Sequence, residues 1–235
     1  MKIKNQIYLI SYTLIGILYF ISSSCTEKDN NNDTTPIPGT IADIDGNIYH
    51  TVTICSKLWI VENLKTTRFN DGELIPLVTD SLKWDTLTSP GFCWYKNDAN
   101  AYKNTYGALY NWYAVYSGKL APKGWHIPSI IEWDKMIFCI GGDSAAGDKL
   151  KETGTIHWQS PNYGATNEFG FNALPAGIRG TLGSFSGLRT TTYWWSSSGY
   201  VLSNAWYVSL YYLHSYPQLN ICNLQPGFSV RCVKD

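Results

Sequence analysis

The stretch Gly124-Trp125-His126-Ile127-Pro128-Ser129-Ile130-Ile131-Glu132-Trp133 contains the helix start on which several sequence signals agree. Ser129 and Glu132 have the spacing of a capping box, in which the serine oxygen accepts from the backbone N–H of the glutamate and the glutamate reaches back to the serine N–H. Apolar residues then recur at helical spacing as far as Ile140, and two glycines follow. The pattern predicts a buried amphipathic helix over 130–140.

On the N-terminal side of this helix, the chain reads as a hairpin followed by a third strand. Two β-rich runs, 41–44 and 47–54, flank the Asp-Gly pair at 45–46, which is the strongest short-range hairpin signal. A third strand is expected over 58–61. Asp45 and Asn47 could pair on calcium, but turn chemistry accounts for both residues, and we predict no metal site.

The region between this hairpin and the central helix gives two further expectations. No periodicity is visible over 76–90, which predicts an irregular loop with Trp84 packed inward. Aromatic and apolar residues then recur at spacings of three and four from Tyr106 to Tyr116, and Gly118 follows. This pattern predicts a second helix over 105–117.

The chain after the central helix is aromatic and rich in strand signals. A short helical piece is expected at 145–152, then a long loop to Gly170, and strands from Trp194 onward. Residues 205–213 alternate, so we expect one buried face and one outward face that carries Tyr207 and Tyr211. A last strand is expected over 228–233. Three tryptophans fall in helix or strand alternation and are assigned to the core: Trp125, Trp133 and Trp206.

Composition limits the classes of function. The 235 residues suffice for one domain and a targeting segment, and 15% of them are charged while 15% are aromatic. This balance favours a β-rich extracytoplasmic binding protein. Lysine plus arginine equals aspartate plus glutamate at 18 each, so there is no basic excess to displace phosphate counterions. We therefore expect no nucleic-acid partner.

The N-terminus has the features of a secretory targeting signal. Lys2 and Lys4 precede an apolar run over 7–21 that ends in Ser22-Ser23-Ser24-Cys25. We interpret 1–24 as a signal peptide and Cys25 as the lipidated residue that anchors the protein in the outer membrane, at the cell surface. An uncleaved anchor and an ordinary signal peptide are the alternatives. The polar segment 25–40 is predicted to be a flexible tether, and 41–235 the folded domain.

Several sequence blocks occur in an order typical of one bacterial family. They are Ile60-Val61-Glu62-Asn63-Leu64, Tyr106-Gly107-Ala108-Leu109-Tyr110-Asn111-Trp112, Gly124-Trp125-His126-Ile127-Pro128-Ser129 with Glu132-Trp133, Phe171-Asn172-Ala173-Leu174-Pro175-Ala176-Gly177, Trp195-Ser196-Ser197, Ala205-Trp206-Tyr207 and Gly227-Phe228-Ser229-Val230-Arg231-Cys232. Over about 41–235 the chain resembles the Fibrobacter succinogenes major paralogous domain family, which is found in secreted and lipid-anchored bacterial proteins. The resemblance implies an extracytoplasmic location and does not indicate a catalysed reaction. The acidic run after Cys25 likewise resembles the surface-export signal of Bacteroidota lipoproteins.

A more remote resemblance implies a fold. Ile127-Pro128-Ser129 with Glu132-Trp133, together with Gly227-Phe228, resembles the formylglycine-generating-enzyme branch of the C-type-lectin-like fold. It implies an α+β protein in which two main helices flank small twisted antiparallel sheets with long loops. The Glu-Pro-Asn and Trp-Asn-Asp signatures of calcium-dependent sugar-binding lectins are absent, so a calcium-bridged sugar is not implied.

The sequence contains few of the residue patterns that enzyme active sites require. The formylglycine-generating reaction uses two cysteines a few residues apart that bind copper, whereas the closest two downstream of Cys25, Cys222 and Cys232, are ten residues apart. No Cys-x-x-Cys, His-x-x-x-His or Gly-x-Ser-x-Gly motif occurs. We predict no catalytic residues, no metal and no cofactor.

Five cysteines remain when Cys25 carries a lipid, so at least one lies outside any intrachain disulfide. Cys222 and Cys232 bracket the Gln225-Pro226-Gly227 turn, and we expect them to form a disulfide across neighbouring strands. Two buried thiols are the alternative.

Two functions of different classes remain. The first is a surface binding module that holds a glycan or protein ligand against exposed rings, because such rings give large contact area at low entropic cost. Its expected contacts are Tyr207, Tyr211, Trp158 and Tyr163. The second is a structural envelope protein whose aromatic residues are all core.

Overall fold

The computed structural model of the chain describes residues 39–201 and 203–235. The signal peptide 1–24, Cys25 and almost all of the tether 25–40 lie outside the described residues, so these assignments stay predictions. Across the two described ranges, no helix is long and apolar enough to cross a membrane.

The first sheet has five strands in the order β1-β2-β3-β12-β6, and every neighbouring pair is antiparallel. Its strands are β1 (Thr40–Ala42), β2 (Ile48–Ile54), β3 (Lys57–Ile60), β6 (Trp125–His126) and β12 (Val233–Lys234). Because β12 lies between β3 and β6, the end of the chain is held inside this sheet. Of the strand expected over 228–233, only its last residue continues into β12.

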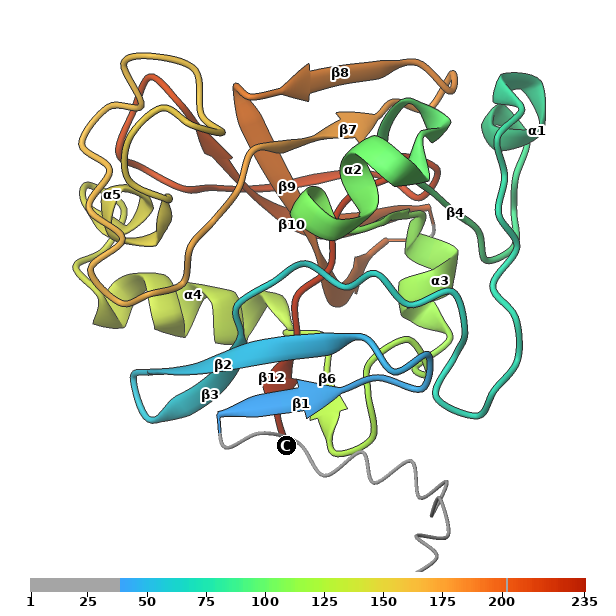
Figure 1. Cartoon of the computed structure of the whole chain (residues 1–235), viewed down its shortest axis with the longest axis horizontal. Coiled ribbons are helices and arrows are strands. Elements are labelled where there is room, and N and C mark those ends of the chain that lie inside the picture. Colours follow the sequence, from blue (N-terminus) through green and yellow to red (C-terminus); the bar gives the residue numbers. More distant parts are fainter. Residues whose placement is uncertain (1–38, 202) are drawn as a thin grey trace, which may run out of the picture. The chain divides into compact units, whose positions relative to one another are not determined.

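The second sheet has the order β11-β10-β9-β7-β8 and is antiparallel except where β7 meets β9 at Gly177 and Thr192. Its strands are β7 (Ala176–Arg179), β8 (Phe185–Leu188), β9 (Thr191–Tyr200), β10 (Asn204–Tyr211) and β11 (Gln218–Asn223). A separate pair consists of β4 (Phe92–Cys93) and β5 (Leu109–Tyr110). Figure 1 shows the two large sheets one above the other.

The helices are short. They are α1 (Ser81–Asp85), the 3-10 helix η1 (Tyr95–Asn97), α2 (Ala99–Tyr106), α3 (Trp112–Tyr116), α4 (Ile130–Cys139) and α5 (Ala146–Leu150). Strands hold 32% of the described residues and helices 18%. The expected architecture of two main helices flanking small sheets is therefore wrong: the fold is mostly β, and two curled sheets organise it. The motifs behind the resemblance mark one helix start, at Ser129, and one bridge region, at Gly227 and Phe228, so they do not fix how many helices and strands lie between them.

The predicted central helix is confirmed as α4. Ser129 Oγ accepts from the Glu132 backbone N at 3.3 Å, and the Glu132 carboxylate accepts from the Ser129 backbone N at 2.9 Å. This is the capping box expected from the sequence. The hairpin is also confirmed, because Gly46 takes a φ of 77° in the turn that joins β1 and β2.

The single helix predicted over 105–117 is wrong. Gly107 (φ 75°) ends α2, β5 follows, and Asn111 then caps α3 by accepting from the Ala114 backbone N. A Cβ at residue 107 would lie 2.8 Å from the Asn63 Cβ and from the Leu64 carbonyl oxygen, so the chain passes against the segment after β3 here. At this close approach the Ala108 backbone N donates a hydrogen bond to the Leu64 carbonyl oxygen at 2.9 Å. This bond is not part of a helix. The loop expected over 76–90 contains the short α1, and Trp84 is fully buried, as predicted.

The second sheet is buried on both faces. Val208 and Leu210 pack with Trp133 of α4 in one core cluster, whereas Ala205 packs with Trp195 and Phe228 in another. The pairing of β9 with β10 shifts between Ala205 and Tyr207. A strand covered on both sides has no outward face, so the outward Tyr face expected over 205–213 does not form.

The core assignments of Trp125 and Trp133 are confirmed, since their side chains are buried. That of Trp206 is wrong, because this ring is only half-buried beside Tyr200.

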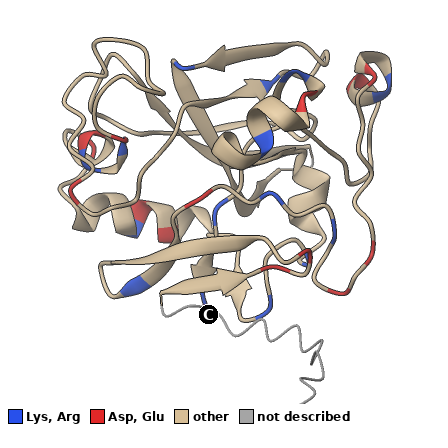
Figure 2. Ribbon diagram, viewed as in Figure 1, with Lys and Arg blue, Asp and Glu red and all other residues tan. Residues whose placement is uncertain are grey.

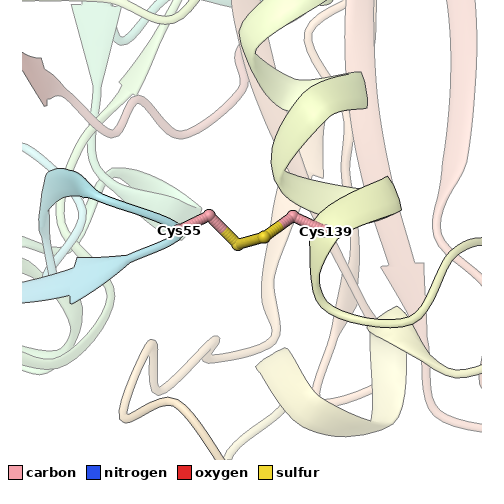
Figure 3. The surroundings of a disulfide bond; sticks show 2 residues. All are labelled: Cys55 and Cys139. Atoms are coloured by element: carbon pink, nitrogen blue, oxygen red, sulfur yellow. A yellow bond between two sulfur atoms is a disulfide. The ribbon is translucent and has the colours of Figure 1, made fainter.

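The disulfide joins Cys55, in the β2–β3 turn, to Cys139, the last residue of α4 (Figure 3). Cys93, Cys222 and Cys232 are free, so the expected pairing of Cys222 with Cys232 is wrong. The reason is their placement: Cys222 faces Ala205 across the β10–β11 pair of the second sheet, while Cys232 is buried next to β12 in the first.

Basic and acidic residues are interspersed along the described chain rather than gathered on one element (Figure 2). All three hydrophobic clusters consist of residues between Ile41 and Val233. The described residues, 39–201 and 203–235, fall in one compact unit with its own interior, and we therefore expect a protein that begins at residue 34 to fold without the segment before it.

Candidate functional site

The four rings expected to contact a ligand lie in different settings. Trp158 is fully buried and its indole Nε1 donates to the Ala173 carbonyl at 2.8 Å, so it is a core residue. Tyr207 is half-buried between Tyr193 and Phe228, with ring centroids 5.5 and 5.2 Å away. Burial raises the pKa of Tyr207 to about 12. These two expectations are wrong, because both rings face the interior.

The backbones of the other two residues, Tyr163 and Tyr211, meet at a buried lysine. Lys151 Nζ lies 2.6 Å from the Tyr163 carbonyl oxygen, 3.5 Å from that of Tyr211 and 3.0 Å from that of His214. The side chain is fully buried, and burial lowers its pKa. Lys151 thus fastens the long loop to the segment after β10. Tyr163 is 58% exposed and is the most open of the four, while Tyr211 is half-buried and contacts Tyr212 and His214.

A concave site lined by exposed rings occurs elsewhere. We call it the aromatic cleft; its volume is about 470 Å³, and it is lined by Trp112, Tyr113, Tyr116, Gly199, Tyr200, Val201, Asn204 and Leu224. Helix α3 supplies one wall, and the ends of β9 and β10 with the turn between them supply the other. Tyr116 and Tyr200, one on each wall, are 74% and 44% exposed.

The local structure holds these rings in place. Trp112 is buried and its Nε1 donates to the Ser196 carbonyl of β9 at 3.0 Å. Tyr116 stacks on Trp112 with centroids 5.1 Å apart and an interplanar angle of 27°. A Cβ at Gly199 would lie 3.3 Å from the Trp112 ring, so glycine lets the strand approach the indole closely. The Tyr200 ring meets Trp206 edge to face at 5.6 Å.

The lining of the cleft carries no charged side chain. It offers flat amphipathic rings, two tyrosine hydroxyls at exposed positions and the amide of Asn204. Rings of this kind give large contact area at low conformational cost, and an amide can donate and accept at once. The cleft therefore suits a neutral ligand rich in hydroxyl groups better than an ionic one.

A second constellation of polar groups surrounds His126. Its Nδ1 lies 2.6 Å from Asp235 Oδ1 and its Nε2 lies 2.9 Å from Glu132 Oε1. Burial lowers the pKa of His126, but the bonds to Asp235 and Glu132 outweigh it, so the pKa is raised. Because both ring nitrogens are occupied by carboxylates, His126 has no free nitrogen with which to take a proton from a nucleophile. Among the described residues, no group of three or more His, Cys, Asp or Glu is placed to hold a metal ion.

Sequence reasoning missed Tyr116 and Tyr200 for different reasons. The regular spacing of apolar residues over 105–117 predicts a buried helix face that includes Tyr116. In the structure this residue lies at the exposed end of α3. Tyr200 lies at the end of β9, where burial stops. The available signal was position: an aromatic residue in the last turn of a helix or at the end of a strand lies beyond the core that the rest of the element covers.

The comparisons with known proteins give one match. The model of the Fibrobacter succinogenes major domain matches residues 52–234. Neither the curated proteins nor the solved structures yielded a significant match. The matched segment contains α4, both walls of the aromatic cleft and all five strands of the second sheet. Since the match covers well over half of the chain, the protein belongs to the Fibrobacter succinogenes major domain family.

Proposed function

We propose that the protein is a non-catalytic binding module, anchored at the outer membrane by a lipid on Cys25, that holds a neutral glycan in the aromatic cleft. The single observation that carries the proposal is the pair of exposed rings, Tyr116 and Tyr200, on opposite walls of an uncharged cleft of about 470 Å³. A volume of this size is in the range of small-ligand sites, roughly 300–1,000 Å³.

The setting of the two rings supports the proposal. Tyr116 rests on Trp112, which is itself fixed by its bond to Ser196, so the platform is already ordered before a ligand arrives. Preorganised contacts lose less entropy on binding, which favours affinity. The anchor is supported by the charged start, the short apolar run and the serines before Cys25.

A structural envelope role is the second candidate, and one observation favours it. Nine of the ten tryptophans are buried, so most of the aromatic content belongs to the interior rather than to a ligand face. The two candidates differ in what they require of the exposed tyrosines: a binding module needs them, whereas a scaffold does not.

The test uses residues 34–235 on an array of neutral and acidic glycans, followed by calorimetry on any hit. Tyr116→Ala and Tyr200→Ala should each weaken binding about 30-fold, corresponding to about 2 kcal/mol for a central aromatic contact. The matched control is Tyr216→Ala, because Tyr216 is 46% exposed, like Tyr200, and lies outside the cleft. All three variants should keep the unfolding midpoint of the parent protein.

A hit whose affinity survives both cleft substitutions would show that the glycan site is elsewhere. Silence across the array, with binding to a surface protein that needs Tyr116, would assign the cleft to a protein ligand. If neither a glycan nor a surface protein binds, the structural envelope role would be favoured. Intact-mass analysis of the native protein tests the anchor separately, since a mature form without lipid at Cys25 would contradict it.

A further inference from the structure

A second pocket lies beside the disulfide, away from the aromatic cleft. We call it the disulfide pocket; it has a volume of about 470 Å³ and is enclosed by the β2–β3 turn, α4 and β12. Figure 3 shows the Cys55–Cys139 bond running from that turn to the end of the helix. Both cysteines line the pocket. None of its lining residues contributes to the aromatic cleft.

The floor of the disulfide pocket is apolar. Ile54, Trp59, Met136 and Val233 line it, and each of these side chains is at most 3% exposed overall. They belong to the core cluster that joins α4 to both sheets. These side chains back the pocket, and the apolar surface open to a ligand is mainly the exposed Cys55–Cys139 disulfide with the stems of the rim lysines. Covering that surface with an apolar group removes it from water.

The rim carries two exposed lysines. Lys57 follows the β2–β3 turn and Lys135 lies on the exposed side of α4. Both residues are exposed, and neither ammonium group makes a hydrogen bond or ion pair within residues 39–201 and 203–235. Unpaired cations at the mouth of an apolar pocket attract an anionic group.

One carboxylate also lines the pocket, that of Glu132, but it is already engaged. Its oxygens accept from the Ser129 backbone N and Oγ, each at 2.9 Å, and approach His126 Nε2 at 2.9 Å. These bonds hold the Glu132 carboxylate in place without cancelling its charge, so the lining carries two lysine charges against one glutamate. The charge of the pocket mouth is therefore positive.

We propose that the disulfide pocket binds a small amphipathic anion, with an apolar body on the floor and one carboxylate between Lys57 and Lys135. Its volume suits a ligand of that size. The site is independent of the proposed glycan cleft, so either one can fail without the other.

The test titrates octanoate, and separately octanol, into residues 34–235 by calorimetry. The double variant Lys57→Gln/Lys135→Gln should bind octanoate about fivefold more weakly, because two exposed charge contacts are lost. It should bind octanol as the parent does. The control double variant Lys83→Gln/Lys96→Gln has the same net charge and also replaces exposed lysines, but both lie outside the pocket; it should bind octanoate normally.

Two further readouts define the site. From hexanoate to octanoate the affinity should rise, by up to about fourfold for each added methylene, because the apolar floor buries the chain. Higher salt should reduce the difference between parent and rim variant, since exposed charges are screened. Thermal melts of both double variants should match the parent.

Failure to bind octanoate at one site per chain would overturn the proposal. So would equal weakening in the control double variant, which would assign the effect to net charge. Loss of octanol binding to the same extent as octanoate in the rim variant would show that the two lysines shape the pocket rather than bind an anion.

Discussion

The disulfide pocket and the aromatic cleft have similar volumes, about 470 Å³ each, but their walls are fastened in different ways. One wall of the disulfide pocket is α4, which is held covalently at its end by Cys139 and by a capping box at its start. One wall of the cleft is α3. The Trp112 ring holds this helix to β9 by packing and by one hydrogen bond, from its Nε1 to the Ser196 carbonyl. A covalent cross-link therefore fixes one wall of the disulfide pocket, whereas only non-covalent contacts fix that wall of the cleft.

The linings differ as much as the walls. The disulfide pocket combines aliphatic side chains with two lysines, whereas the cleft combines tyrosine rings with an amide. Equal volume therefore does not imply a common ligand: the first lining selects for charge and an apolar body, the second for neutral polar groups on a flat face. The predictions below test whether the fastening of α4 matters for the first site alone.

The largest expected effect comes from removing the cross-link. The double variant Cys55→Ser/Cys139→Ser frees a loop spanning 84 residues, and the chain-entropy model then predicts a loss of about 4.5 kcal/mol in the free energy of unfolding. Urea titration of residues 34–235 measures it. The parent protein in a reducing agent is the matched control and should behave like the variant.

The same variant also sharpens the comparison of the two sites. Octanoate affinity should fall, because the β2–β3 turn is no longer tied to α4. Any glycan bound in the cleft should keep its affinity, since the two linings share no residue. Equal loss at both sites would mean that the disulfide supports the whole fold rather than one wall.

A smaller effect is expected at the start of α4. Ser129→Ala removes the side-chain acceptor for the Glu132 N–H and the hydroxyl donor to its carboxylate. The expected loss is about 1 kcal/mol of unfolding free energy, measured by urea titration. Ser129→Thr keeps the hydroxyl and should recover most of it. An unchanged midpoint for the alanine variant would show that other contacts hold this end of the helix.

What the sequence predicted well was local. The helix 130–140 and the hairpin around Asp45-Gly46 each depend on residues within a few positions of one another, so their signals are complete in a short window. The merged helix at 105–117 failed because Gly107 is needed for an approach to Asn63, which lies far away in the sequence. Periodicity alone could not separate two short helices from one long helix.

The candidate sites depend on contacts that are further apart still. Cys55 and Cys139 meet across 84 residues, and short spacing favoured the wrong pair, Cys222 and Cys232. Tyr207 is a plausible surface ring only if the second sheet has an outward face, and Trp158 only if the loop before Gly170 lies away from the core. Both faces are covered, by α4 and by the segment around Phe228, and alternation within one strand does not reveal this.

The smallest expected effect concerns pH and the ion network of α4. Asp235 and Glu132 raise the pKa of His126 above its ordinary value of 6.5 despite the opposing effect of burial. Burial raises the pKa of Glu132, but the bonds from Ser129 and His126 outweigh it and lower the pKa below 4.5. A raised histidine pKa contributes stability that is complete below the unfolded value and is lost as pH rises through the folded value. A lowered glutamate pKa contributes stability that is complete above its unfolded value and is lost as pH falls through the folded value.

Both contributions are therefore complete between pH 4.5 and 6.5. His126→Gln should destabilise residues 34–235 most in that window and less at about pH 9, because this stability is lost as pH rises through the raised folded pKa of the histidine. Because the side chain is 37% exposed, solvent screening limits the difference to below about 1 kcal/mol. Urea titrations of parent and variant at both pH values measure it, and Asp235→Asn should retain part of the effect through Glu132. A penalty for His126→Gln that stays constant up to about pH 9 would show that the imidazole acts by packing, and α4 would then be fastened by its disulfide and its cap alone.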